Sequence, residues 1–325
     1  MRIWFALTLL IMASVISNKS HAVDEAGFAA YVETLKTEAL AHGISAETVE
    51  VAFADAEFYQ RAVTADRNQP EFTQTLDTYL PRAVPDWKVR QGLAKYNEHR
   101  ELLEEIGAEF GVQPRFIVAL WGVETNYGSY TGNFKVISSL STMAYEGRRE
   151  EFFKRQLMQA LEIIDAGHIS PEQMRGSWAG AMGQTQFMPS SFLAYAVDYD
   201  KDGKIDIWNS YADVFASAAN YLSQAGWDNS KTWGRQVRIP EGFDASLAKR
   251  DNKKTLSEWQ ALGVRRYDGR DLPVREIQAG MVMPDDENGR IYLTYDNWDV
   301  LMDWNRSNYF VVVVGYLADR IQLGR

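Results

Sequence analysis

The segment that most constrains this chain runs from Pro114 to Glu124 and is apolar at nearly every position. Proline suits the first position of a helix, and the spacing of the apolar residues predicts a buried helix that begins there. On that helix Glu124 shares a face with Leu120 and Trp121. A carboxylate turned toward a core costs several kcal/mol unless it is paired, hydrogen-bonded or protonated. The fold must therefore enclose this helix and accommodate its acid.

Two interpretations of Glu124 follow from this helix. The functional one is a raised pKa at the edge of a cleft, which general-acid chemistry needs near neutral pH. The structural one is a helix-end carboxylate in a salt bridge with a neighbouring arginine, and the helix alone favours this one. Evidence from other segments of the chain is therefore needed to choose between these two interpretations of Glu124.

Size and composition narrow the class of protein. A chain of 325 residues can bury enough apolar surface to fold without disulfides, and this chain has no cysteine. Its formal charge of −10 argues against a dedicated nucleic-acid binder. At the N-terminus, a short positive start precedes an apolar run from Ile3 to Ile16, and Ser20-His21-Ala22 offers a cleavage site. We therefore expect residues 1–22 to be a signal peptide, and no lipid attachment through an N-terminal cysteine.

The pattern along the chain changes near residue 230. Up to about Leu161 the apolar residues recur at intervals of three and four, which predicts helices. Residues 68–87 carry three prolines and predict an irregular connector. Further on, short runs of β-formers bounded by turn residues predict strands, namely Arg235–Pro240, Gly280–Pro284 and Arg290–Tyr295.

The last stretch, residues 300–323, has a mixed pattern. The run from Val311 to Val314 favours a strand, whereas Tyr316 to Ile321 favours a helix. Both interpretations stay open at this point.

A glycine- and amide-rich segment from Gly176 to Ser191 is the second candidate functional region. Its four glycines permit close backbone approach and unusual dihedral angles. It also supplies neutral donors and acceptors suited to hydroxyl and acetamido groups, from Ser177, Gln184, Gln186 and Ser190. The alternative is a structural turn that enters a helix with Pro189 near its first position.

The acidic loop that begins at Asp198 has the spacing of a calcium site. The sequence D-Y-D-K-D-G-K-I-D matches an EF-hand loop, with the obligatory turn glycine at Gly203. Carboxylates placed this densely repel one another unless a cation lies between them. We predict a structural Ca²⁺ site with ligands from Asp198, Asp200, Asp202, the Lys204 carbonyl and Asp213. The alternative is an acidic loop in solvent.

The sequence does not decide which residue supplies the last calcium ligand. Position 12 of the loop, normally a bidentate glutamate, is Asn209, a weaker ligand. Asp213 would complete the site by folding back, and Asp206 is another candidate.

Arg148 and Arg149 form a third candidate region. Their guanidinium groups could bind a carboxylate on a substrate. The alternative, which the sequence favours, is a solvated pair balanced by Glu150 and Glu151. No G-x-S-x-G, Walker or Rossmann motif occurs in the chain, and the histidines lack metal-site spacing.

In this order, the motifs resemble the lytic murein transglycosylase B family, bacterial enzymes that cleave peptidoglycan. The resemblance rests on G-V-E-T-N-Y-G at 122–128, Y-E-G-R-R at 145–149, and the whole segment 176–191 followed at once by the acidic loop. W-N-R-S-N-Y-F at 304–310 is a further similarity. Together these motifs cover most of the mature chain. The chain departs from the family pattern at Trp304 and Phe310, where tyrosines are usual, and at Gln184-Thr185, where Tyr-Gly is frequent.

The resemblance implies a mainly α (α+β) fold, with a lysozyme-like helical core, an additional helical region and a small β domain. We place the signal peptide at 1–22, and the helical region and core at 23–230 with the EF-hand-like loop at 198–213. The β domain would occupy 231–297, and residues 298–325 would return to the core. With the signal peptide, we expect a periplasmic monomer that acts on peptidoglycan glycan strands, with proteins of cell-wall synthesis or hydrolysis as candidate partners.

For the chemistry, the resemblance implies that Glu124 is the only catalytic acid/base. It would cleave the β-1,4 bond between N-acetylmuramic acid (MurNAc) and N-acetylglucosamine (GlcNAc) and leave a 1,6-anhydro-MurNAc end. No organic cofactor is expected. Two alternatives stay open: a hydrolytic muramidase with a distant second carboxylate, and a non-catalytic, calcium-stabilised peptidoglycan-binding protein. The residues expected to bind the substrate are Ser177, Gln186, Arg148, Arg149, Asn305 and Tyr127.

Overall fold

The computed structural model describes residues 25–67 and 74–324, so the expected signal peptide lies outside the described residues. Most of the fold is helical, and a small sheet forms a separate part of it, as expected for a mainly α protein. The helices are α1 Glu25–His42, α2 Ala46–Phe53, α3 Gln60–Arg67, α4 Leu76–Ala83, α5 Asp86–Glu98, α6 Arg100–Phe110, α7 Pro114–Thr125, α8 Val136–Glu146, α9 Glu150–Asp165, α10 Pro189–Tyr195, α11 Tyr211–Gln224, α12 Leu256–Ala261, α13 Asp296–Trp304 and α14 Asn308–Leu323. The strands are β1 Phe134–Lys135, β2 Arg175–Gly176, β3 Gly234–Arg238, β4 Lys254–Thr255, β5 Arg265–Arg266, β6 Gln278–Val282 and β7 Ile291–Thr294.

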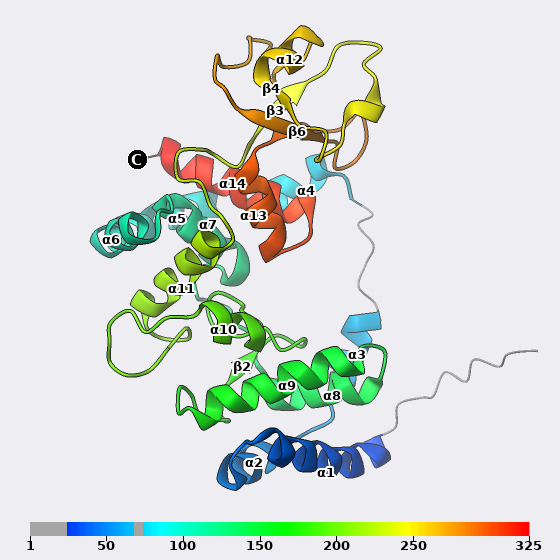
Figure 1. The fold of residues 1–325 in the computed structure, drawn as a ribbon, viewed down its shortest axis with the longest axis vertical. Helices are drawn as coiled ribbons and strands as arrows, with labels where there is room; N and C mark the ends of the chain where they lie inside the picture. The colour runs from blue at the N-terminus through cyan, green and yellow to red at the C-terminus, as the bar shows by residue number, and fades with distance from the viewer. Residues whose placement is uncertain (1–24, 68–73, 325) are drawn as a thin grey trace, which may run out of the picture.

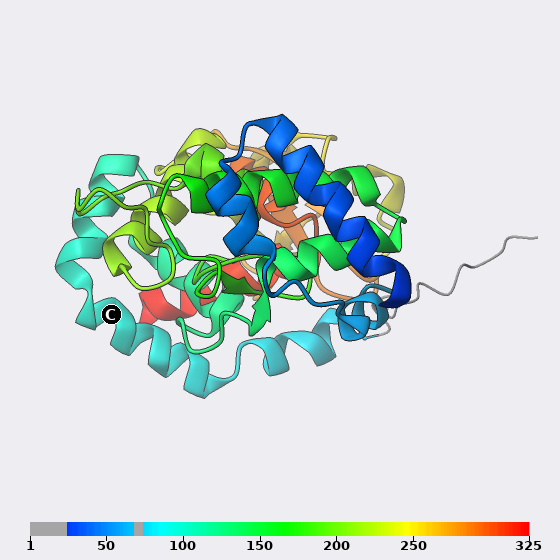
Figure 2. The same ribbon diagram turned by 90° about the horizontal axis from the view of Figure 1, so that it is seen from below.

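The molecule is elongated, with the strand-rich part at one end and α1 and α2 at the other (Figure 1). Helices α7, α11, α13 and α14 lie between these two ends. Seen from below, α1 and α2 lie across α8 and α9 (Figure 2), and these helices are in contact.

Three clusters of buried apolar side chains hold the fold together. The first surrounds α7 and includes residues of α5, α6, α11 and α14. The second joins α1 and α2 to α8, α9 and the segment that leads into α10. The third is formed by residues of the small sheet and of α12. Tyr221 and Trp304 pack against both of the first two clusters, so they mark the seam between them.

The larger sheet has the strand order β4-β6-β7-β3-β5, and all its neighbouring strands are antiparallel. The three runs of β-formers identified in the sequence contribute β3, β6 and β7. The sheet packs on the helical body through an aromatic group formed by Trp233, Tyr292 and Trp298, in which the two indole rings stack 5.5 Å apart. This contact fixes the sheet against α13 and α14.

Two expectations about secondary structure need correction. Residues 68–87 are not an irregular connector throughout, because α4 lies within them and α5 begins at Asp86. Leu76 and Leu80 of α4 are buried, and this burial outweighs the presence of Pro81 inside the helix. In the C-terminal stretch, the valine run lies in helix α14, because every residue from Val311 to Val314 is enclosed by the first cluster. Burial here overrides the β-propensity of valine. None of the helices in the described ranges is long and apolar enough to cross a bilayer.

Candidate active site

Helix α7 presents Glu124 at the end of the most deeply buried helix in the first cluster. Every residue from Phe116 to Gly122 is buried. The helix begins with Pro114 and stops just after Glu124, because Asn126 and Tyr127 have left-handed backbone angles, with φ of 51° and 61°. Such angles are uncommon outside glycine and are held only where the surroundings enforce them. This turn places the Glu124 carboxylate at the helix end.

Glu124 is half-buried, and its carboxylate makes one hydrogen bond to the described part of the chain. The indole Nε1–H of Trp304 donates to Oε1 of Glu124 over 2.7 Å. Burial raises the pKa of Glu124 to about 7, although the hydrogen bond from Trp304 acts in the opposite direction. No lysine, arginine or histidine nitrogen in the described residues lies within 4.0 Å of this carboxylate. The salt-bridge interpretation of Glu124 is therefore wrong.

Trp304 comes from the last position of α13, 180 residues further along the chain. Its ring packs against Phe187 at 5.3 Å and against Tyr221 at 4.7 Å between centroids. Sequence reasoning noted Trp304 only as a departure from a tyrosine pattern and missed its contact with the acid. Tryptophan is a good hydrogen-bond donor with a large apolar ring, and no sequence pattern links it to a residue so distant.

The glycine-rich segment is tied to α7 beside Glu124. The hydroxyl of Thr125 donates to the backbone oxygen of Gln184 over 2.9 Å. The indole of Trp121 donates to the side-chain oxygen of Gln184 over 2.7 Å. Gln184 is buried and its amide nitrogen donates to the Trp208 carbonyl. Gln184 is therefore structural. The helix entry with Pro189 at its first position also occurs, as α10.

Ser177 and Gln186 each keep one free hydrogen-bonding function. The hydroxyl oxygen of Ser177 accepts from the backbone N–H groups of Ala179 and Ala181, which leaves its O–H available as a donor. The amide nitrogen of Gln186 donates to two backbone carbonyls, including that of Thr131 at 3.0 Å, which leaves its Oε1 as an acceptor. Both residues are half-buried. They hold the segment in shape and can still bind a ligand.

Two glycines of this region permit close packing, one against backbone and one against a side chain. A Cβ at Gly132 would lie 2.1 Å from the Gly176 carbonyl oxygen, and a Cβ at Gly128 would lie 2.2 Å from Oε1 of Gln184. Both glycines have positive φ. The segment after Glu124 and the glycine-rich segment therefore fit together only because side chains are absent here.

Three other predicted site residues lie away from the Glu124 carboxylate. Tyr127 is buried, and its hydroxyl donates to the Lys88 carbonyl over 2.8 Å, so it supports α7 from the core side. Arg148 and Arg149 both pair with the buried carboxylate of Asp66, with 2.7 Å between Arg149 and Asp66. They join the turn between α8 and α9 to α3. The expected partners Glu150 and Glu151 are not their partners in the structure.

Asn305 is exposed and follows Trp304 directly, at the end of α13. An open cavity of about 510 Å³ lies just beyond it, between the start of α14 and the residues before α4. It is lined by Gln74, Thr75, Pro284, Asp285, Arg306, Ser307, Asn308 and Tyr309. In the chain, Asn305 therefore lies between Trp304, which contacts Glu124, and Arg306, which lines this cavity.

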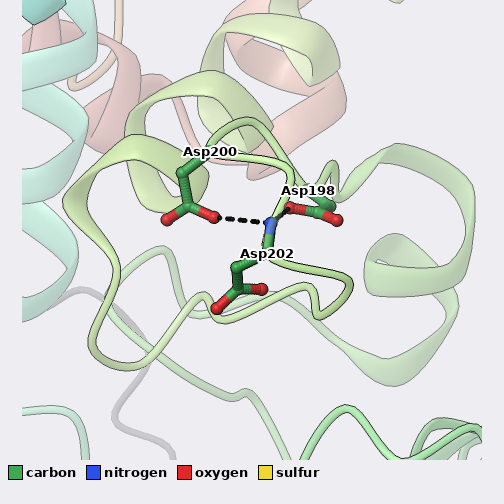
Figure 3. A group of neighbouring side chains, drawn as sticks. All are labelled: Asp198, Asp200 and Asp202. Carbon is green, nitrogen blue, oxygen red and sulfur yellow. Dashed lines mark hydrogen bonds between the residues drawn. The ribbon is translucent and has the colours of Figure 1, made fainter.

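The acidic loop brings Asp198, Asp200 and Asp202 together, with one oxygen from each within 4.8 Å of the others (Figure 3). It is the only such group among the residues that the structure describes. The backbone supports the arrangement: Lys201 and Gly203 have positive φ, and the Gly203 N–H donates to Asp198. Oxygens from three carboxylates at this spacing suit a hard divalent cation such as Ca²⁺.

Asp213 lies behind this loop and is not one of the converging carboxylates. Its two oxygens accept from the backbone N–H groups of Tyr199 and Asp206, each over 2.7 Å. It is buried at the first turn of α11. Asp213 thus joins the two ends of the loop, and its assignment as a ligand stays a prediction. The side chain of Asp206 is also engaged, by the N–H groups of Trp208 and Asn209.

Comparison with known proteins agrees with this arrangement. A family model described as "Transglycosylase SLT domain" matches residues 27–319. The membrane-bound lytic murein transglycosylase B of Escherichia coli (strain K12) is 30% identical over 258 residues, which are 76% of this chain and 67% of that protein.

Solved structures are similar over nearly the whole chain. SltB3 from Pseudomonas aeruginosa, in complex with NAG-anhNAM-pentapeptide, has a TM-score of 0.87 and 44% identity, covering 91% of this chain and 79% of that one. The Escherichia coli lytic transglycosylase Slt35, in complex with calcium, has a TM-score of 0.77 and 25% identity, covering 93% and 94%. The chain therefore belongs to the transglycosylase SLT domain family and is a lytic murein transglycosylase, an enzyme that acts on peptidoglycan.

Proposed function

We propose that this enzyme cleaves the MurNAc–GlcNAc β-1,4 bond without water and leaves a 1,6-anhydro-MurNAc end, with Glu124 as its only acid and base. The observation that carries the proposal is the isolation of Glu124. Burial alone raises its pKa, the indole donor opposes that rise, and no other carboxylate contributes to it. A hydrolase needs a second carboxylate at a set distance, as nucleophile or as base. An internal attack needs only one.

The reaction takes place in two proton transfers. Protonated Glu124 gives its proton to the glycosidic oxygen, and the bond between that oxygen and C1 of MurNAc breaks. The resulting carboxylate takes the proton of the C6 hydroxyl, and the O6 oxygen forms a new bond to C1. Glu124 ends protonated as it began, so a pKa of about 7 suits both halves of the cycle.

Ser177 and Gln186 supply the polar contacts to the sugar. The free O–H of Ser177 can donate to an acetamido carbonyl, and Oε1 of Gln186 can accept from a hydroxyl or an amide N–H. The exposed amide of Asn305, which follows Trp304 in the chain, is proposed to add a third contact. Tyr127, Arg148 and Arg149 are assigned supporting roles behind these contacts.

The relatives lend support to this proposal. SltB3 has been solved in complex with NAG-anhNAM-pentapeptide and with NAG-NAM-pentapeptide, an anhydro sugar and its counterpart. We extend this substrate class, peptidoglycan glycan strands, to the present chain. We also propose a periplasmic location, which work on that polymer and the signal-like residues 1–22 support.

The acidic loop is proposed to bind a structural Ca²⁺. Asp198, Asp200 and Asp202 would hold it, together with the carbonyl of Lys204. The calcium complex of Slt35 supports this assignment. A bound cation would relieve the repulsion of three adjacent carboxylates and keep the segment before α11 in place.

The test of the reaction is the mass of its products. Purified peptidoglycan is digested with the enzyme, and the released muropeptides are weighed. We expect products one water lighter than those of a muramidase digested in parallel. Products with the hydrolytic mass would replace this proposal by the muramidase alternative. A folded preparation that binds peptidoglycan but releases no product would favour the non-catalytic alternative.

A further inference from the structure

The two oxygens of Glu124 have different surroundings. Oε1 accepts from the indole of Trp304 over 2.7 Å, whereas Oε2 makes no hydrogen bond to any described residue. An indole N–H donates and never accepts. The proton of neutral Glu124 therefore cannot point from Oε1 toward Trp304, and it is left for Oε2.

We propose that Trp304 is a positioning residue that reserves Oε1 as a permanent acceptor, so that Oε2 both delivers the proton to the glycosidic oxygen and recovers it from the C6 hydroxyl. This inference rests on the proposed function and adds to it the choice of oxygen. A tyrosine hydroxyl at this position could donate or accept. The indole removes that ambiguity.

The indole can perform this role because its ring is fixed. Phe187 and Tyr221 pack against it at 5.3 Å and 4.7 Å, from two different segments of the chain. Rotation of the indole would disturb both contacts. A fixed donor orients the carboxylate as well, since the N–H direction sets the plane in which Oε1 accepts. Accurate orientation of this kind contributes directly to the rate of proton transfer.

Few other ionisable groups face this pair. From α11, Tyr221 packs on the indole, and burial raises its pKa to about 12, so it is neutral at working pH. From α13, exposed Asp303 precedes Trp304, and from α10, Tyr195 packs on Tyr221. The segment 182–188 carries no ionisable side chain. Trp304 is thus the one described side chain that stabilises the charged form of Glu124.

The experiment replaces the donor and keeps an aromatic ring. In Trp304→Phe the charged form of Glu124 loses its hydrogen bond, so its pKa rises, by about one unit. The alkaline limb of the pH profile of kcat/KM should move upward by the same amount, and kcat at the optimum should fall about tenfold or more. Trp304→Tyr should return the pKa toward the wild-type value but keep a reduced kcat, because the hydroxyl can also accept the proton.

Trp298→Phe is the matched control. Trp298 is fully buried in the same helix, and its Nε1 has no hydrogen-bond partner in the described residues. It therefore reports the effect of losing an indole without losing a bond to Glu124. Its pH profile should coincide with that of the wild type, and thermal melts identify any variant that fails to fold.

A direct titration separates this inference from the proposed function. The Glu124 carboxyl is followed by ¹³C NMR in the ligand-free protein, with Glu124→Gln to assign its signal. A higher pKa in Trp304→Phe is expected whatever the reaction product. A pKa that stays or falls in Trp304→Phe, or a Trp304→Tyr variant with full kcat, would overturn the inference. A shifted pKa in a protein that releases hydrolytic products would refute only the anhydro product.

Discussion

Two groups of carboxylates in this enzyme show how neighbours determine what an acid does. Glu124 stands alone among apolar rings, touched by one indole donor, and its pKa is raised to about 7. Asp198, Asp200 and Asp202 stand together on an exposed loop, held by backbone N–H groups. An isolated, desolvated carboxylate retains a proton, and clustered carboxylates in contact with solvent retain a cation. The same side-chain chemistry therefore suits a proton carrier at one place and a metal site at the other, which are the roles proposed above.

The largest effect is expected from a substitution that removes the proton carried by Glu124. Glu124→Gln keeps the shape and the acceptor for Trp304 but cannot give or take a proton. We expect activity on peptidoglycan to fall by about a thousandfold or more, while the response of the melting temperature to Ca²⁺ stays unchanged. Glu101→Gln, at an exposed position on α6, is the control and should behave as the wild type. Substantial activity in Glu124→Gln would remove this residue from the mechanism.

The cost of desolvating Glu124 should be visible in stability. Its pKa of about 7 in the folded protein exceeds the ordinary value of 4.5, so the folded state binds the proton more tightly. Folding is therefore disfavoured progressively as the pH rises from 4.5 to 7, by about 3 kcal/mol in full above pH 7. Glu124→Gln should be more stable than the wild type at pH 8 and nearly equal to it at pH 4, as measured by urea unfolding. Equal stability at both pH values would contradict the assigned burial.

In the acidic loop, substitution of Asp213 tests how much its hydrogen bonds to the backbone stabilise the loop. Asp213→Ala leaves the partly buried N–H groups of Tyr199 and Asp206 without acceptors. We expect a loss of about 2 kcal/mol of unfolding free energy even in the presence of chelator. Asp213→Asn retains one acceptor and should lose less. If Asp213 acted mainly as a metal ligand, the whole loss would disappear on chelation.

The smallest expected effect is that of the cation itself. A weak Ca²⁺ site contributes about 1 kcal/mol when the free Ca²⁺ concentration is about five times its dissociation constant, so chelation of Ca²⁺ should lower the melting temperature by a few degrees. Asp202→Asn should abolish this response, whereas Mg²⁺ should not replace Ca²⁺. A melting temperature indifferent to chelator would show that the loop works without a metal.

Much of the fold could be predicted from the sequence. Helix α7 and its start at Pro114 followed from local apolar periodicity, and the main strands followed from β-formers bounded by turn residues. The valine run of α14 could not be assigned, because its burial on all sides depends on partners far along the chain. Its helical state is a tertiary effect.

The candidate site was predictable in its acid and in its loops, and much less so in its contacts. The Glu124 environment depends on Trp304, which lies 180 residues away, and the partner of Arg148 and Arg149 is Asp66 on α3. Gln184 and Gln186 look equivalent in the sequence, yet the first is buried and the second half-buried. Only the packing of distant segments distinguishes such residues.

The position of Trp304 and Tyr221 at the seam of two core clusters has a consequence for when the enzyme becomes active. Glu124 belongs to the body built around α7, while Phe187, which braces the indole, belongs to the cluster of α1, α2, α8 and α9. A chain in which only one of these bodies has formed has the acid but lacks a braced donor. On the proposed mechanism, we therefore expect proton transfer by Glu124 only after both bodies have formed and packed together.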